Sequence, residues 1–301
     1  MVSRTAMTPR FGVYQYQHLP VAELRDRWRR AEELGFDVLW NVDTVVDPDR
    51  PRSWMFDGPS VLVAMALETS RIRIGTLVTS LFFRHPVLAA RAAATVDHLS
   101  AGRLELALGV GDPSAGPAAA GVPDWPAGER VARFREFADL TDRLLRSPVT
   151  TFEGGFYRCR EAEVIPGPVQ QPRPPITIAA HGPRMLAIAA EFGDGWSSWG
   201  GYGIESEGEF FDRTSQRALD FDRLCRERDR DPSTVHHSLV CFPPLTPWES
   251  VGYFEEMVGR YGGLGIDEFV LYWPRRWRDK PSEDRMFERV AVDVLPRMRS
   301  A

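Results

Sequence analysis

The chain carries a small set of residues whose types and positions suit chemistry on a bound ligand. Asp43 and Asp112 each follow a short apolar run, and either carboxyl could act as an acid, a base or a hydrogen-bond acceptor. The stretch AAHGPRM at 179–185 passes through Gly182 and Pro183 into a predicted helix, and Arg184 adds a positive charge. Small residues let backbone approach a ligand, and free N–H groups at a helix start bind anions. The stretch therefore predicts a phosphate site, with a tight strand-to-helix turn as the alternative.

Aromatic side chains gather at the ends of the predicted strands. A cavity walled by indoles suits a large planar ligand, whereas the alternative is that the rings simply plug and pack this end of the fold. The tryptophans concerned are Trp54, Trp196, Trp199, Trp273 and Trp277.

Other residue counts argue against several chemistries. Cys159, Cys225 and Cys241 are far apart and form no CxxC pair, which argues against zinc ribbons, iron–sulfur sites and a disulfide framework. Lys280 is the only lysine and lies in a polar run, so Schiff-base mechanisms are disfavoured. His236 and His237 are neighbours on a predicted strand and point to opposite faces, so we expect no shared metal ion.

Composition indicates an ordinary globular protein. The 301 residues are 43% apolar and 26% charged, with a net charge of −5, which disfavours a nucleic-acid-binding surface. No apolar run reaches the length of a transmembrane helix, and residues 1–10 do not resemble a signal peptide. We therefore expect a cytoplasmic protein.

Apolar runs and amphipathic stretches alternate along the chain, which is typical of parallel strands joined by helices. The predicted strands are 11–16, 38–43, 72–78, 104–110, 175–180, 194–199, 236–242 and 267–272. The predicted helices are 20–34, 57–69, 86–99, 128–146, 183–192, 205–229, 247–262 and 282–299. Helix limits follow from capping residues, namely starts at Asp57, Pro86, Pro183, Pro247 and Ser282 and a stop at Gly35.

Eight such units predict a single (β/α)₈ barrel domain over 1–301, with a small hairpin insertion at about 147–174. The alternative, an open doubly wound sheet, is disfavoured because GVGDPSAG at 109–116 lacks GxGxxG. In a barrel the active site lies at the carboxyl ends of the strands.

Four segments resemble the bacterial-luciferase-like oxidoreductases, which use FMN or the deazaflavin coenzyme F420. They are RAEELGFDVLWNVD (30–43), the run from LETSRIRIG to LELALGVG (67–111), GERVARFREF (128–137) and QPRPPITIAAHGPRMLAIAAEFGDGW (171–196). The family fold is a (β/α)₈ barrel, which matches the count of units. The resemblance implies that Leu77–Val78 is a cis peptide supporting the ring, and that the phosphate lies near Gly182, Pro183, Arg184 and Met185. The further cofactor-binding residues that it implies are Asp43, Thr79, Gly111, Asp112, Ala180 and His181.

One position departs from the family pattern. Relatives often follow the acidic residue after strand two with a histidine that assists proton transfer, whereas this chain has Asp43-Thr44. The Thr44 hydroxyl can donate a hydrogen bond but cannot titrate near neutral pH. Asp112 stands where some F420-dependent relatives carry a catalytic glutamate, so it is the first candidate for the proton donor, with Asp43 as the second.

The resemblance implies hydride transfer with F420 or oxygen insertion with reduced FMN, and Asp43 together with the arginines of WPRRWR (273–278) favours F420. An apolar or aromatic substrate is expected over the ring, between Tyr16, Trp54, Trp196, Trp199 and Trp273. The alternatives are a flavin-binding protein without turnover and a barrel enzyme of unrelated chemistry, such as a lyase. Possible partners are a separate reductase and a second copy of the chain, which would meet through the apolar faces of helices 57–69 and 86–99.

Overall fold

The computed structural model describes residues 8–47, 50, 52–274 and 281–300. Their contacts group into two compact units. Unit 1 comprises 1–15, 30–39 and 180–301, and unit 2 comprises 16–29 and 40–179. That 1–301 is one domain stays a prediction.

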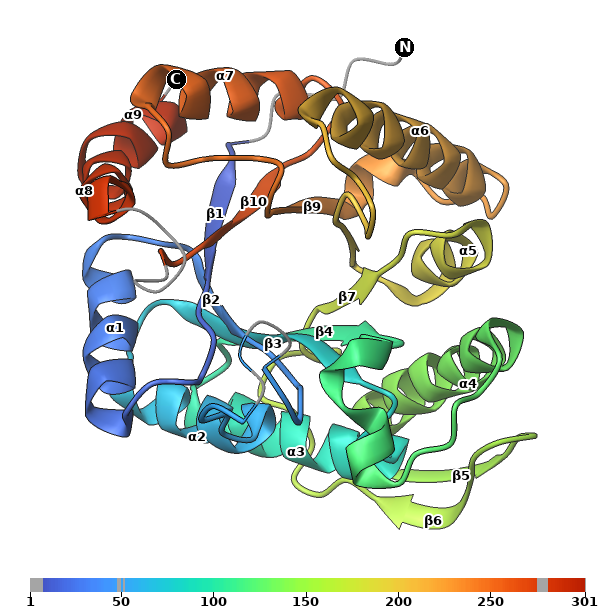
Figure 1. Cartoon of the computed structure of the whole chain (residues 1–301). Helices are drawn as coiled ribbons and strands as arrows, with labels where there is room; N and C mark the ends of the chain where they lie inside the picture. The colour runs from blue at the N-terminus through green and yellow to red at the C-terminus, as the bar shows by residue number, and fades with distance from the viewer. Residues whose placement is uncertain (1–7, 48–49, 51, 275–280, 301) are drawn as a thin grey trace. The chain divides into compact units, whose positions relative to one another are not determined.

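Eight strands in the described residues form one closed parallel barrel, which confirms the predicted (β/α)₈ fold (Figure 1). Their order around the barrel is β1-β10-β9-β8-β7-β4-β3-β2. Most of their residues are buried, as the apolar composition of the predicted strands requires. The strands are β1 Arg10–Tyr14, β2 Val38–Asn41, β3 Arg73–Ser80, β4 Leu104–Gly109, β7 Ile176–Ala179, β8 Gly195–Ser198, β9 His236–Cys241 and β10 Glu268–Tyr272.

The helices follow the strands in alternation. They are α1 Val21–Glu33, α2 Gly58–Glu68, α3 Pro86–Leu99, α4 Ala127–Arg146, α5 Pro183–Phe192, α6 Glu207–Arg226, α7 Val251–Gly262, α8 Pro281–Arg289 and α9 Leu295–Ser300. A π-helical turn, Val290–Val294, separates α8 from α9, so the single helix predicted at 282–299 is interrupted. Short 3-10 turns lie at Pro113–Ala115 (η1), Pro117–Ala120 (η2) and Pro232–Thr234 (η3).

Capping residues set most helix starts as predicted. Asp57 caps α2, and proline occupies the first turn of α3 and of α5. The predicted start at Pro247 is wrong, because α7 begins at Val251 after Ser250, whose hydroxyl accepts the Tyr253 N–H. A serine cap next to the first helical residue satisfies a free N–H group that proline cannot.

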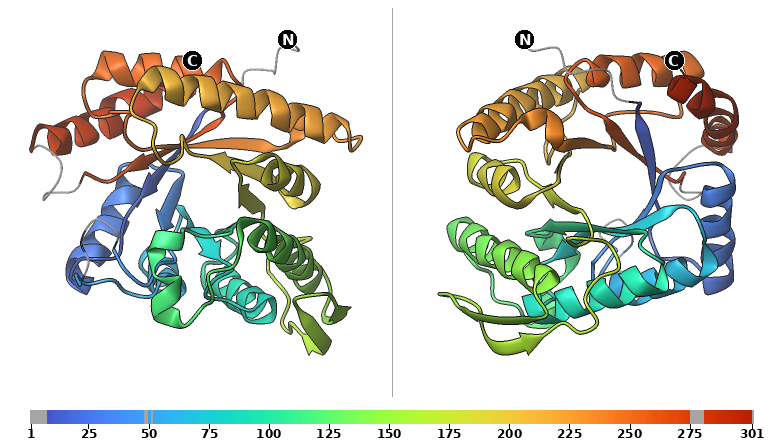
Figure 2. Two further views of the ribbon diagram at one scale, coloured as in Figure 1. Left: turned by 45° about the vertical axis from the view of Figure 1, so that its right-hand side comes forward. Right: turned by 180° about the vertical axis from the view of Figure 1, so that it is seen from behind.

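In unit 2, α3 packs against both α2 and α4. The insertion forms an antiparallel hairpin of β5 Val149–Glu153 and β6 Arg158–Glu163, as predicted. The hairpin runs alongside α4 in the views of Figure 2. Glu136 on α4 accepts the backbone N–H groups of Gly155, Phe156 and Tyr157 at the hairpin turn, which fixes it to the helix.

In unit 1, the first strand is tied to the end of the chain. The Phe11 N–H donates to Oδ2 of Asp37 at 2.7 Å, and Arg299 on α9 donates to the same oxygen at 2.7 Å and to the Gly35 carbonyl at 2.9 Å. Gly35 adopts φ +77° and ends α1 as predicted. Among the described residues, no helix is long and apolar enough to span a membrane.

Candidate active site

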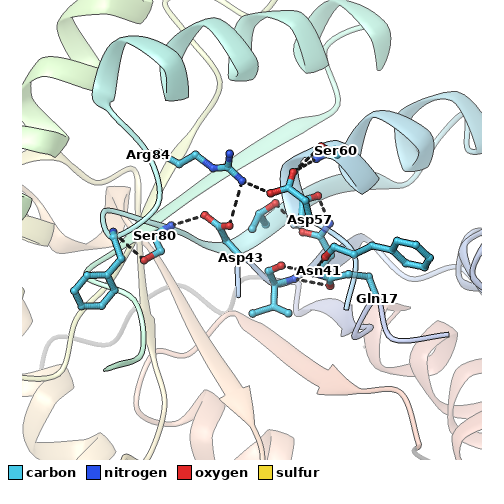
Figure 3. A network of polar contacts seen from close by, with 12 residues as sticks. Gln17, Asn41, Asp43, Asp57, Ser60, Ser80 and Arg84 are labelled. Carbon is cyan, nitrogen blue, oxygen red and sulfur yellow. Dashed lines mark hydrogen bonds and ion pairs between the residues drawn. The ribbon is translucent and has the colours of Figure 1, made fainter. Parts of the chain in front are cut away.

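Asp43 follows β2 and is held by two neighbouring segments of unit 2. Its side chain is nearly inaccessible to solvent, and its Oδ2 accepts the N–H of Ser80, the last residue of β3, at 3.1 Å. Its Oδ1 lies 3.4 Å from Nη2 of Arg84, in the loop between β3 and α3 (Figure 3). The carboxyl that the sequence placed at the end of a strand is thus buried and fixed at both oxygens.

Arg84 also contacts a second carboxyl group. The same Nη2 donates to Oδ1 of Asp57 at 2.5 Å, while Oδ2 of Asp57 accepts the backbone and hydroxyl protons of Ser60 (Figure 3). Asp57 is half exposed, whereas Asp43 is almost fully buried. One guanidinium therefore joins the end of β2, the start of α2 and the start of α3.

Burial dominates the electrostatics of Asp43. Desolvation raises the pKa of this carboxyl, and the nearby Arg84 charge and the Ser80 N–H only partly oppose it. At Asp57, burial also acts to raise the pKa, but the hydrogen bonds from Ser60 and Arg84 outweigh it, so the pKa is lowered. Of the two carboxyl groups, Asp43 is the one suited to exchange a proton.

The Leu77–Val78 peptide bond is cis, as the family resemblance implies. It lies within β3, where the register with β4 shifts between Thr76 and Thr79. The Val78 side chain packs on Gly109 of β4 so closely that a Cβ on that glycine would lie 2.6 Å from a Val78 methyl group. This strand end is therefore shaped by residues that leave no free space between β3 and β4.

Gly111 packs against the same strand end. It has φ +88°, and a Cβ there would lie 2.1 Å from the Ser80 hydroxyl oxygen and 3.0 Å from the Phe82 ring. The Ser80 backbone N–H is the group that holds Asp43. Gly111 thus lets the β4 loop approach the residue that positions the buried carboxyl.

The other two predicted acid–base candidates have local partners. The Thr44 hydroxyl donates to the Val46 carbonyl at 2.6 Å. Asp112 is partly exposed and caps η1, accepting the Ser114 N–H at 2.8 Å. Their catalytic roles stay predictions, and Asp43 has the more enclosed environment.

In unit 1, the start of α5 is open to a ligand. Gly182 is the N-cap residue, no side chain caps the helix, and a Cβ at Gly182 would meet nothing within 4 Å. Residues 181–184 are exposed, and Met185 turns inward. The uncapped N–H groups of this helix and the side chain of Arg184 could bind an anion, and the phosphate site at this helix start stays a prediction.

The predicted substrate-binding aromatic residues differ in their surroundings. Trp196 is fully buried, stacks on Phe221 at 5.1 Å and donates its indole N–H to the Ala180 carbonyl at 2.9 Å. Its placement in a substrate site is corrected, because it packs β8 against α6 and leaves no surface for a ligand. Trp199 lies just after the end of β8 and has different surroundings.

Trp199 keeps a polar group available. Its backbone N–H donates to Nε2 of His181 and its carbonyl accepts from Arg217, while its ring meets Tyr202 edge to face at 4.9 Å. The indole nitrogen is buried and has no acceptor among the described residues. A ligand acceptor would satisfy it.

The remaining predicted residues are spread over both units. In unit 2, Tyr16 stacks on His18 and Trp54 is exposed. In unit 1, Trp273 contacts Phe287 at 4.7 Å and donates its backbone N–H to Tyr14. Arg275 and Trp277, and with them most of the WPRRWR segment, lie outside the described residues. The described residues contain no cluster of three or more potential metal ligands.

Sequence reasoning missed Arg84 as a site residue. The signal was present, because Arg84 directly precedes His85, the N-cap residue of α3, and so had to lie at the carboxyl end of β3. His85 itself caps the helix through Nδ1, in keeping with the structural role expected of a residue at a helix start. Gln17 was also missed; its amide donates to the carbonyls of Val42 and Phe56 and thereby braces the loop that follows β2.

Comparisons with known proteins show the family and the fold of this chain. The model of the family described as luciferase-like monooxygenase matches residues 3–241, so the chain belongs to this family of (β/α)₈ proteins. An F420-dependent glucose-6-phosphate dehydrogenase from Intrasporangium calvum is 34% identical, with 92% of this chain and 95% of the relative aligned.

Two solved structures share the fold. An F420-dependent secondary alcohol dehydrogenase in complex with an F420–acetone adduct has a TM-score of 0.77 and 19% identity, over 95% of this chain and 99% of that one. A riboflavin lyase with modified FMN and riboflavin has a TM-score of 0.76 and 15% identity, over 98% of this chain and 92% of that one.

Proposed function

We propose that this protein is an F420-dependent oxidoreductase that transfers hydride between the coenzyme and a small organic substrate. The observation that carries the proposal is the extended match to a relative named as an F420-dependent dehydrogenase, aligned over nearly the whole of both chains.

Each unit, taken by itself, offers a feature that suits one part of a coenzyme that is planar at one end and anionic at the other. Unit 2 offers the Leu77–Val78 strand end and the buried Asp43 carboxyl to a ring. Unit 1 offers the uncapped start of α5, with Ala180, His181 and Gly182 leading into it, to a phosphate. When bound, F420 supplies a carbon centre that accepts or delivers hydride; the protein holds the ring, excludes water and exchanges the accompanying proton.

Proton exchange is assigned to Asp43 in this proposal. The Thr44 hydroxyl is engaged by Val46, and Asp112 caps a surface turn. Asp43 combines burial with a raised pKa, which is the combination expected of a proton-exchanging carboxyl. On the substrate side, the unsatisfied indole N–H of Trp199 would bind an oxygen of the substrate or the coenzyme.

The first experiment is a titration of the purified protein with oxidised F420 and with FMN, oxidised and reduced, followed by quenching of its nine tryptophans. Binding of F420 alone is expected. Reduction of bound F420 is then assayed with glucose 6-phosphate and with 2-propanol, the substrate classes named for the similar proteins. Preference for reduced FMN would instead indicate a monooxygenase, and F420 binding without turnover on any donor would indicate a binding protein. If neither cofactor binds below about 1 mM, equivalent to ~4 kcal/mol, the proposal is wrong.

The proposal includes a homodimer in the cytoplasm. Leu62, Met65 and Val96 lie on the two helices whose apolar faces are expected at the interface, but they are buried within the chain itself. Leu67 and Leu88 are exposed on α2 and α3 and remain available to a second copy. Light scattering on the eluting protein would give the mass of the assembly, and a Leu88→Glu variant is expected to lower it to that of one chain.

A further inference from the structure

One nitrogen of Arg84 is shared between two carboxyl groups of different exposure. Nη2 lies 2.5 Å from Oδ1 of Asp57 and 3.4 Å from Oδ1 of Asp43 (Figure 3). The closer contact goes to the half-exposed carboxyl, and the longer one to the buried carboxyl. The buried Asp43 carboxyl, which most needs a nearby positive charge, therefore has the weaker contact with Arg84.

The arrangement is rigid enough to maintain this unequal sharing. Gly58 packs against the end of β2, and a Cβ there would lie 2.3 Å from the Val42 carbonyl oxygen and 3.3 Å from Cα of Asp43. The Asn41 side chain also donates to the Gly58 carbonyl at 2.7 Å. The start of α2, and with it Asp57, is thus fixed beside the loop that carries Asp43.

Asp57 is held in turn by its role as a cap. Its Oδ2 accepts from the backbone N–H of Ser60 at 3.0 Å and from the Ser60 hydroxyl at 2.6 Å, which leaves Oδ1 directed at Arg84. A helix start prefers a negative charge at this position, so Asp57 stays ionised and keeps its hold on the guanidinium.

We propose that Asp57 is a positioning residue for Asp43, acting by drawing the shared Arg84 charge away from the buried carboxyl. The inference rests on the proposed function, in which Asp43 exchanges the proton that accompanies hydride transfer. Asp43 would then supply the acid–base group that Thr44 cannot. Its hydrogen bonds orient the carboxyl, while its negative charge is balanced only weakly by Arg84, so that it can take up a proton. Arg84 and Asp57 are the charged side chains that act on Asp43 within the described residues.

The proposal predicts opposite effects for two substitutions. Asp57→Asn keeps an equally good helix cap but removes the competing charge, so the proton affinity of Asp43 is expected to fall several-fold. Arg84→Gln removes the cation, so the proton affinity is expected to rise about tenfold. Arg84→Lys is expected to lie between Arg84→Gln and the unmodified protein.

The measurement is a pH titration of carboxyl-¹³C-aspartate by NMR on the protein without coenzyme. The Asp43 resonance is identified by its loss in Asp43→Asn. Asp139→Asn serves as a matched control, because Asp139 pairs with Arg143 on the exposed surface of α4 in the same unit. The control is expected to leave the Asp43 titration unchanged.

Combining the substitutions distinguishes two explanations for an effect of Asp57 on Asp43. One is competition between the two carboxyl groups for Arg84, and the other is direct charge repulsion between them. In an Arg84→Gln background, Asp57→Asn should change the proton affinity of Asp43 far less than it does alone. An equal change in both backgrounds, or an unchanged Asp43 titration in Asp57→Asn, would overturn the proposal. If Arg84→Gln does not fold, Arg84→Lys replaces it in the same cycle. Asp57→Asn is then expected to change the proton affinity of Asp43 less in the Arg84→Lys background than in the unmodified protein.

The pH dependence of F420 binding gives a second readout. Its midpoint should move in the same direction as the Asp43 resonance in each variant. If the unmodified protein does not bind F420, the proposed function fails while the NMR result still decides the role of Asp57. If F420 binds and the Asp43 titration does not respond to Asp57, only the present inference fails.

Discussion

Replacing Gly111 by alanine tests whether the loop after β4 positions the buried carboxyl. The new methyl group would lie 2.1 Å from the Ser80 hydroxyl and 3.0 Å from the Phe82 ring, on a backbone with φ +88°. The left-handed conformation costs an alanine about 1–2 kcal/mol, and crowding in a packed site adds about 1–3 kcal/mol. We expect Gly111→Ala to lower the free energy of unfolding by about 2–5 kcal/mol and, because Ser80 must move, to weaken F420 binding.

Gly121→Ala is the matched control. Gly121 has φ +71°, but a Cβ there would meet nothing within 4 Å, so only the conformational cost of about 1–2 kcal/mol applies. Adding Ser80→Ala to Gly111→Ala removes the closest contact and should restore part of the lost F420 affinity. Unfolding in urea and fluorescence titration with F420 measure the two effects. Equal losses for Gly111→Ala and Gly121→Ala would refute the argument from close approach.

Three further predictions follow from single contacts. Arg103 donates to Ser100, Thr69, Ile72 and Ala66 around the ends of α2 and α3, so Arg103→Met should cost about 3–5 kcal/mol in urea unfolding. Gly182→Asp should cap α5 without loss of stability, yet its negative charge should weaken F420 binding at least about tenfold. The F420 affinity of Gly182→Ala should stay within about threefold of that of the unmodified protein. The Asp267 carboxylate, whose Oδ2 lies 3.5 Å from Nδ1 of His236, raises the pKa of His236, so protonated His236 stabilises the fold. This contribution is complete below about pH 6.5 and is lost as pH rises through the folded pKa. Unfolding free energies from pH 5.5 to 8.5 should therefore fall less in His236→Gln than in the unmodified protein.

The barrel could be predicted from the sequence because its signals are local. Buried parallel strands read as short apolar runs, and residues such as Asp57 and Gly35 mark where helices begin and end. The prediction failed where two local signals competed: Pro247 and Ser250 both resemble a helix start, and only the serine supplies an acceptor for the Tyr253 N–H. The π turn at Val290–Val294 has no local signature in an apolar stretch.

The candidate site was predicted less completely because its geometry depends on packing. The ends of strands identify Asp43 and Gly111, but nothing local in the sequence shows that Arg84 reaches both Asp43 and Asp57. The cis bond at Leu77–Val78 was expected only through the family resemblance, since neither residue favours it. Trp196 was misplaced because a tryptophan within a strand can point toward either face, and here the ring packs on Phe221 of α6.

The tie between the two ends of unit 1 also bears on the order of events during synthesis on the ribosome. The last segment of unit 2 ends at Ala179, so all of its contacts can form while more than a hundred residues remain to be translated. Unit 1 contains the strand β1, and Asp37, which accepts the Phe11 N–H, also accepts a hydrogen bond from Arg299. A nascent chain in which α9 has not yet emerged therefore lacks the contacts that Arg299 makes with Asp37 and Gly35, and loss of α9 would affect the surroundings of the first strand as well as α9 itself.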